Sequence, residues 1–244
     1  MIIQLYLLKF AFVFNRIYLI NIIGRKKKMK NLCIVSDFDG TITNRDGLYS
    51  FIETYAKGDW EKIEQDWAEG KISSKECLIE EFKLVPNLSE KLVDTFIKTM
   101  TIDEHFADFY HYLCEQKIDF YVVSDGVDYF IEKILENFGL SNLKIISNHG
   151  EFRNGKFEWS FPNDSNNCLN NAGTCKCEVV KNLYQQYDKI CYIGDGVSDY
   201  CVADKVDILF AKNRLLKFCK DKKINYVEYN NFSDIKAELA TIIN

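Results

Sequence analysis

The fold is decided by the stretch LCIVSDFDGT at residues 32–41. Its first half, Leu32–Ser36, is a short apolar run of the kind that lies buried in a parallel sheet. Its second half places Asp37 and Asp39 directly after that strand, at the end where open α/β sheets bind their ligands. An isolated Asp-x-Asp pair is often only a capping or solvated pair, so its meaning depends on partners elsewhere in the chain.

Later segments repeat the first strand and alternate with helical segments. The further strand-like runs are Ile118–Ser124, Lys144–Ser147, Lys189–Gly194 and Val206–Phe210. This alternation predicts an α/β protein with a three-layer, Rossmann-like parallel sheet as its core.

About eighty residues with helical periodicity separate the first two predicted strands. The helical segments are Leu48–Lys57, Trp60–Glu69, Ser74–Leu84, Ser89–Met100 and Glu104–Glu115. Because this length exceeds an ordinary crossover, we expect an inserted helical cap at 45–101, with the core formed by 29–44 and 102–244. Asn154-Gly155, between Phe152 and the alternating Phe157 and Trp159, predicts a small β-hairpin flap.

Two other predicted strands also end in polar residues. Ser124-Asp125-Gly126 ends the second strand, and Gly194-Asp195-Gly196-Val197-Ser198-Asp199 ends a later one. If these strands are parallel neighbours of the first, their ends converge with Asp37 on one crevice.

This order of elements, with Lys176 before the last strand end, resembles the haloacid dehalogenase superfamily of phosphatases and its phosphoserine-phosphatase-like branch. The resemblance covers nearly the whole chain from Met29. Within the branch, Ser147-Asn148-His149, the hairpin, the Asn-rich loop at 162–174 and Cys175-Lys176 look like the methionine-salvage phosphatases.

The resemblance implies a Mg²⁺-dependent phosphomonoesterase that acts on a small phosphate ester through an aspartyl-phosphate intermediate. A phosphate ester is doubly anionic, so the site must supply positive charge before a carboxylate attacks it. By resemblance Asp37 is the nucleophile and a metal ligand, and Asp39 is the general acid and base that also binds Mg²⁺ through its carbonyl. Asp195 is expected as a further metal ligand. Asp199 is expected at the metal as a ligand or a supporting residue, or alternatively as a first-turn acid of the next helix.

Lys176 would neutralise charge between Asp37 and the phosphate, with Lys181 as the second candidate. Either lysine could instead be a solvated charge on a helix face.

Substrate binding is expected from Thr41, Asp46, Ser124, Asp125 and Gly126. Ser124 and the following amides would hold phosphate oxygens at a helix start. Asp125 stands where relatives often have Gly, which puts a clean anion pocket in doubt. Asp46 is either a polar contact to the substrate or the N-cap of the first cap helix.

The cap has no arginine beyond Arg45 at its entrance, because the next arginine is Arg153. Recognition of a free amino acid's carboxylate favours a planar Arg fork. We therefore expect a keto-enol sugar phosphate with an uncharged tail rather than phosphoserine, and Arg45 is the residue that could support the alternative. Apolar cap residues together with Trp159 would suit a thioether tail.

The charge of the chain disfavours a nucleic-acid partner. From Met29 onward, 25 basic residues face 36 acidic residues, a net charge of −11. Such a body repels nucleic acid. A catalytically silent binding protein on the same fold is also disfavoured, because it would need neither Asp37 nor Asp39 as an acid or base.

Residues 1–23 are nearly all apolar and are followed by the basic run Gly24–Lys28. This leader is long enough to anchor the protein in a membrane, but we favour a translation start at Met29 and a cytoplasmic protein. The nine cysteines suggest buried thiols in a reducing compartment. Among them, Cys168, Cys175 and Cys177 lie close together without matching a standard zinc spacing, so loop thiols are favoured over a metal site.

Overall fold

The computed structural model describes residues 30–165, 168 and 171–243. The predicted leader at 1–28 lies outside the described residues. Contacts divide the chain into Met1–Lys30 and one compact unit, Asn31–Asn244, and the fold below is that of the second unit. Within the described residues, no helix combines the length and the apolar character that crossing a bilayer requires.

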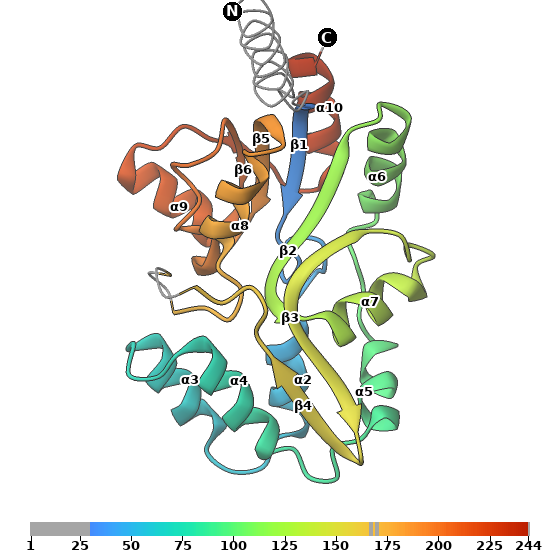
Figure 1. Cartoon of the computed structure of the whole chain (residues 1–244), viewed down its shortest axis with the longest axis vertical. Helices are drawn as coiled ribbons and strands as arrows, with labels where there is room; N and C mark the ends of the chain where they lie inside the picture. The colour runs from blue at the N-terminus through green and yellow to red at the C-terminus, as the bar shows by residue number, and fades with distance from the viewer. Residues whose placement is uncertain (1–29, 166–167, 169–170, 244) are drawn as a thin grey trace, which may run out of the picture. The chain divides into compact units, whose positions relative to one another are not determined.

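One sheet forms the centre of this unit, with the strand order β4-β3-β2-β1-β5-β6-β7 (Figure 1). Its strands are β1 (Lys30–Ser36), β2 (Asp119–Val127), β3 (Lys144–Arg153), β4 (Lys156–Ser160), β5 (Tyr187–Gly194), β6 (Ile208–Ala211) and β7 (Val227–Glu228). The pairs β1–β2, β2–β3, β5–β6 and β6–β7 are parallel, and only the edge pair β3–β4 among the described pairings is antiparallel. The predicted α/β class is confirmed, and β1 lies between β2 and β5, where the strand order reverses.

Helices cover both faces of the sheet and complete the three layers. One face packs against α6 (Phe106–Glu115), α7 (Asp128–Asn137) and α10 (Phe232–Ile243), and the other against α8 (Lys176–Leu183) and α9 (Asn213–Lys222). Successive side chains of β1 point to opposite faces, so Ile34 joins the first core and Cys33 and Val35 join the second.

The inserted segment contains α2 (Gly47–Tyr55), α3 (Trp60–Ala68), α4 (Ser74–Lys83) and α5 (Glu90–Ile97). These helices begin and end within a few residues of the predicted segments. Ser73 caps α4 in a reciprocal pair with Glu76, and Ser89 caps α5. Both serines satisfy free amides at a helix start, which explains why the helices begin there.

The predicted β-hairpin is confirmed, and it continues the central sheet. The expected third strand, Lys144–Ser147, continues through Arg153 as one long strand, and β4 returns along its far half. Asn154 and Gly155 turn the chain with φ of 51° and 75°, the backbone shape that favours Asn-Gly in two-residue hairpins. The flap is therefore an extension of the sheet toward the cap (Figure 1).

Phe82 of α4 joins the cap to the hairpin and the core. Its ring lies 5.6 Å from Phe51, 6.1 Å from Phe130, 5.3 Å from Phe157 and 4.8 Å from Trp159, between ring centroids. Because Phe51 is in α2 and Phe130 is in α7, one aromatic cluster connects cap, core and hairpin.

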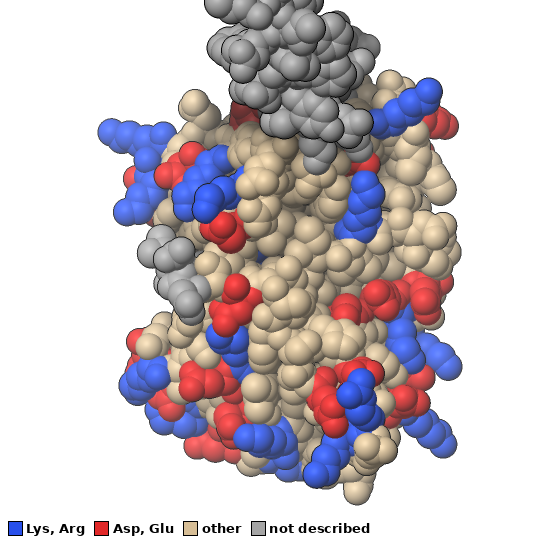
Figure 2. All heavy atoms as spheres, in the orientation of Figure 1, with Lys and Arg blue, Asp and Glu red and all other residues tan. Residues whose placement is uncertain are grey.

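Charged side chains of both signs alternate over the face drawn in Figure 2. Several cap lysines pair with acids on the same helical segments: Lys62 with Asp66, and Lys83 with Glu80. These lysines are therefore solvated pairs on helix faces, as expected from the sequence.

Phe82→Ala should lower the free energy of unfolding by about 3–5 kcal/mol, because it opens a cavity among four other aromatic rings. Phe138→Ala serves as the control, since Phe138 is 41% exposed, and should change the value by no more than about 0.5 kcal/mol. Urea unfolding of both variants measures the difference. Equal losses would show that the aromatic cluster does not hold the cap in place.

Candidate active site

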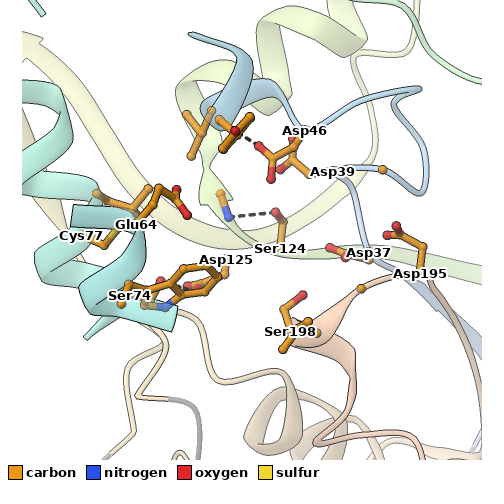
Figure 3. A pocket seen from close by; sticks show the side chains of 18 of the residues that line it. Asp37, Asp39, Asp46, Glu64, Ser74, Cys77, Ser124, Asp125, Asp195 and Ser198 are labelled. Carbon is orange, nitrogen blue, oxygen red and sulfur yellow. Dashed lines mark hydrogen bonds between the residues drawn. The ribbon is translucent and has the colours of Figure 1, made fainter. Parts of the chain in front are cut away.

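Three neighbouring strand ends meet at one cavity of about 550 Å³ (Figure 3). Asp37 follows β1, Ser124 lies on β2, and Asp195 follows β5. Because β2 and β5 flank β1 in the sheet, Asp37 stands between the other two. Residues of the cap, including Leu48 and Trp67, line the opposite side of this cavity.

Lys176 is buried beside Asp37 at the bottom of the site. Its ammonium nitrogen lies 2.7 Å from Asp37 Oδ1, 2.7 Å from Asp199 Oδ1 and 2.9 Å from Ser198 Oγ. Burial alone would lower the pKa of Lys176, but the carboxylates of Asp199 and Asp37 raise it, so the ammonium stays charged. Lys181, the second candidate, is 70% exposed and pairs with Glu178, away from this cluster.

Asp199 uses its oxygens on protein donors. Oδ1 accepts hydrogen bonds from Lys176 and the Tyr192 hydroxyl, and Oδ2 accepts from the backbone amides of Asp195 and Gly196. A carboxylate has about four acceptor positions, and these four donors occupy them. The geometry therefore favours Asp199 as a residue that fixes Lys176 and the Asp195 loop over a direct metal ligand.

The acidic cluster fits a hard divalent cation. Carboxylate oxygens of Asp37, Asp195 and Asp199 lie within 4.8 Å of one another. Burial and the charge of Asp199 hold the pKa of Asp37 well above its usual range, although Lys176 lowers it. The Lys176 ammonium contacts Asp37 and Asp199 but not Asp195, so the three carboxylates keep an excess of negative charge. Oxygen donors of this kind are those that Mg²⁺ prefers.

Thr41, expected to bind substrate, is not among the described residues that line the cavity, and it contacts Asp195. Its hydroxyl donates to Asp195 Oδ1 at 3.0 Å, and the side chain is almost wholly buried behind the cavity. Asn213 adds a hydrogen bond to the other oxygen of Asp195. The prediction assigned Thr41 to the substrate because sequence alone does not tell which way a residue points after a turn.

Asp39 lies at the cap entrance. Its Oδ1 accepts the Gly47 amide at 2.7 Å. Burial, followed by the charge of Asp46, raises the pKa of Asp39 to about 8, so the carboxyl holds a proton at neutral pH. Asp46 is confirmed as the N-cap of α2, because it accepts the Tyr49 amide, and it also lines the cavity. Its contact with a substrate stays a prediction.

Ser124 and Gly126 reach the cavity through a bulge in β2. Val123 pairs with Ile146, and Val127 pairs with Asn148, so three residues of β2 face one of β3. The bulge turns these residues out of the ladder, and the Gly126 amide donates to Ser124 Oγ at 2.9 Å. Because α7 begins only at Asp128, the expected helix start is wrong, and the amides belong to the bulge.

Asp125 ties three segments together. Its carboxylate accepts the Ser74 hydroxyl at 2.5 Å, the Thr174 amide at 2.9 Å and the Asn148 side-chain amide at 3.2 Å. Ser74 begins α4 of the cap, so Asp125 connects the cap to the β2 side of the cavity. These three hydrogen bonds satisfy the Asp125 carboxylate and give it a structural role, which its position in the sequence does not indicate.

Arg45, the candidate for the phosphoserine alternative, and Trp159, the candidate for contact with the substrate tail, lie elsewhere. Arg45 donates to Thr99 and lies over the ring of Phe96. Trp159 packs in the aromatic cluster around Phe82. Neither residue is among those that line the cavity in the described part of the chain.

Sequence reasoning missed Arg214 and three cap residues. Arg214 lines the cavity from the start of α9, and its signal was its position just after another strand of the sheet. Glu64, Cys77 and Glu81 line the cavity from α3 and α4. The one visible signal for these three was the four-residue spacing of Cys77 and Glu81, which puts both on one helix face.

Metal-ligand groups also bear on the cysteine prediction. In the part of the chain that the structure describes, two such groups occur: Glu64, Cys77 and Glu81, and the three aspartates. Neither includes the Cys168, Cys175 and Cys177 trio. Cys177 lies within α8 and Cys175 is the N-cap of that helix, so the prediction of three loop thiols is wrong for Cys177.

Known sequences resemble this chain over most of its length. The family model described as Putative Phosphatase matches residues 32–214. A protein of Bacillus pumilus (strain SAFR-032) is 33% identical over 217 residues, which cover 88% of this chain and 93% of that protein. One of Bacillus cereus (strain AH820) is 30% identical, over 86% and 96%. Both are named 2-hydroxy-3-keto-5-methylthiopentenyl-1-phosphate phosphatase.

Solved structures of phosphoserine phosphatase share the fold. A phospho-aspartyl intermediate analogue superposes with a TM-score of 0.62 and 23% identity, over 85% of this chain and 98% of that one. A substrate-bound complex gives a TM-score of 0.61 with 22% identity, over 86% and 98%. At these identities the likeness supports the predicted three-layer architecture alone.

Gly40→Ala should destabilise the protein more than Gly70→Ala. The two glycines have φ of 73° and 72°, so the backbone cost is the same in both variants. A Cβ at Gly40 would lie 2.8 Å from Asp195 Oδ2, whereas one at Gly70 meets nothing within 4 Å. We expect Gly40→Ala to lose about 1–3 kcal/mol more in urea unfolding. Equal losses would mean that Asp195 is not held against Gly40.

Proposed function

This chain belongs to the Putative Phosphatase family and is a phosphatase of the haloacid dehalogenase type, and we propose that it is a Mg²⁺-dependent phosphomonoesterase. The proposed substrate is a small phosphate ester of the methionine-salvage type. The observation that supports the proposal most directly is the position of Asp37, in contact with Lys176 at 2.7 Å and between the strand ends of Ser124 and Asp195.

The contacts of Asp37 suit a nucleophile. Lys176 and the Phe38 amide both contact Oδ1, which leaves Oδ2 for attack on phosphorus. In the proposed first step Asp37 bonds to phosphorus, the ester P–O bond breaks, and Asp39 gives its proton to the leaving oxygen. The charge of Lys176 reduces the repulsion between the carboxylate and the phosphate.

The second step releases phosphate. Asp39, now ionised, takes a proton from a water molecule, which attacks the phosphorus of the aspartyl-phosphate. The bond to Asp37 breaks, inorganic phosphate leaves, and both carboxyl groups return to their starting states. Ser124 Oγ and the amides of the β2 bulge, Asp125 and Gly126, would hold the phosphate oxygens in both steps.

The proposed Mg²⁺ site consists of the side chains of Asp37 and Asp195 and, by resemblance, the carbonyl of Asp39. The bound ion would supply positive charge to the doubly anionic phosphate. Asp199 and Thr41 would hold Lys176 and Asp195 in position, since each makes its hydrogen bonds to those residues.

The cap side of the cavity suits an uncharged tail. Leu48, Trp67 and Leu78 supply apolar surface on this side of the cavity. The names of the Bacillus relatives support the same substrate class. Phosphoserine is the second candidate, because Arg214 at the cavity could pair with a carboxylate.

We also propose a cytoplasmic location. Eight of the nine cysteines have free thiols in the structure: Cys77, Cys114, Cys168, Cys175, Cys177, Cys191, Cys201 and Cys219. Free thiols in this number are typical of reducing compartments, where disulfides are rare.

Asp37→Asn should abolish phosphate release with the fold intact, because an amide neither attacks phosphorus nor supplies the ionic ligand. Asp39→Asn should lower kcat by roughly 10²–10⁴-fold, the usual contribution of a general acid and base. Asp108→Asn is the matched control, since Asp108 is an exposed residue of α6 that pairs with Lys236. Phosphate release measures the activity of each variant, and circular dichroism checks that each variant is folded. Wild-type rates in Asp37→Asn would refute the mechanism.

The methylthiopentenyl phosphate should be hydrolysed with a higher kcat/KM than phosphoserine. Arg214→Met should lower kcat/KM for phosphoserine by about tenfold or more, the loss expected when a charged hydrogen bond is removed, and should change the other substrate little. A preference for phosphoserine that disappears in Arg214→Met would assign the protein to the second candidate substrate.

A further inference from the structure

Three potential metal ligands lie together on the cap side of the cavity. Glu64 comes from α3, and Cys77 and Glu81 come from successive turns of α4. Their ligand atoms all lie within 4.8 Å of one another. Figure 3 shows Glu64 and Cys77 on the cap helices, across the cavity from Ser124 and Asp37. We call Glu64, Cys77 and Glu81 the cap triad.

One oxygen of the buried Glu81 carboxyl group has no hydrogen-bond partner in the protein. Its side chain is only 4% exposed, and its Oε1 has no hydrogen-bond partner. In the described part of the chain, this is the one buried side-chain oxygen or nitrogen in that state. An unpaired buried carboxyl oxygen carries a full desolvation cost, so it calls for a bound ion or ligand.

Lysines of α4 do not meet this need. Lys75 pairs with Asp164, and Lys83 pairs with Glu80.

We infer that the cap triad binds a thiophilic divalent cation of the Zn²⁺ class. Zn²⁺ accepts thiolate and carboxylate ligands together, whereas Mg²⁺ prefers oxygen ligands and retains water. Three protein ligands would leave the fourth position of a tetrahedral ion open. All three residues of the cap triad line the cavity. The inference does not depend on the proposed substrate or on the Asp37 chemistry.

The test uses the full chain after removal of metals by chelation. Co²⁺ is the probe, because a thiolate-bound tetrahedral Co²⁺ shows a charge-transfer absorption in the near ultraviolet and strong visible bands. We expect one equivalent of Co²⁺ to produce these bands in the presence of excess Mg²⁺. One equivalent of Zn²⁺, measured by equilibrium dialysis and metal analysis, should then replace the Co²⁺.

Variants assign the bands to the triad. Cys77→Ser should remove the charge-transfer absorption, and Glu81→Gln should weaken Zn²⁺ binding by more than the roughly 10–100-fold that residues behind a ligand contribute. Glu80→Gln is the matched control, because Glu80 is the exposed neighbour of Glu81 and pairs with Lys83. Asp195→Asn should leave the Co²⁺ bands unchanged, which separates this site from the aspartate cluster.

Retention of the bands in Cys77→Ser would overturn the inference and indicate other thiols. Cys177→Ser identifies that case, because Cys177 lies near Cys201 and Lys205 on another face of the core. A wild-type chain without thiolate bands would also overturn it, and would mean that Glu64 and Glu81 share a proton instead. If Cys77→Ser does not fold, Glu64→Gln, at a half-buried position, replaces it. Glu64→Gln should weaken Co²⁺ binding, and unchanged binding would overturn the inference.

Discussion

The ion pair between Lys176 and the two aspartates is the constraint on which the site depends. Lys176 begins α8, Asp37 follows β1, and Asp199 lies in the turn after β5, so one buried ammonium joins three segments. Removing one member of such a buried pair costs about 3–5 kcal/mol, because the other charges are left uncompensated. The same contacts that orient the proposed nucleophile therefore also hold the strand ends together.

The sequence was sufficient to predict those site residues whose position depends only on the neighbouring strand or helix. Asp37, Lys176 and Asp195 follow apolar strands or begin a helix, and a parallel sheet brings such positions to one edge. It was insufficient where an atom's partners come from distant segments. Asp125 is satisfied by Ser74, Asn148 and Thr174, and no spacing in the sequence indicates that combination.

The same reason explains the other differences. The β2 bulge depends on which residue of β3 pairs with Val127, and the cap triad depends on how α3 packs against α4. The long β3 was divided into two predicted segments because its first half is apolar and its second half passes beyond the core. When a strand passes from the buried core to a more exposed region, its apolar pattern stops, and the sequence then predicts that the strand ends there.

The hydrogen bond between Asp125 and Ser74 has a consequence for substrate entry. Asp125 contributes its backbone to the proposed phosphate pocket and its side chain to the first turn of a cap helix. Thermodynamic linkage requires that coupling between two such sites be reciprocal. If phosphate in the bulge favours the position of α4 described here, then a ligand that fixes α4 must tighten phosphate binding by the same factor. One carboxylate thus makes occupancy at the two ends of the cavity interdependent.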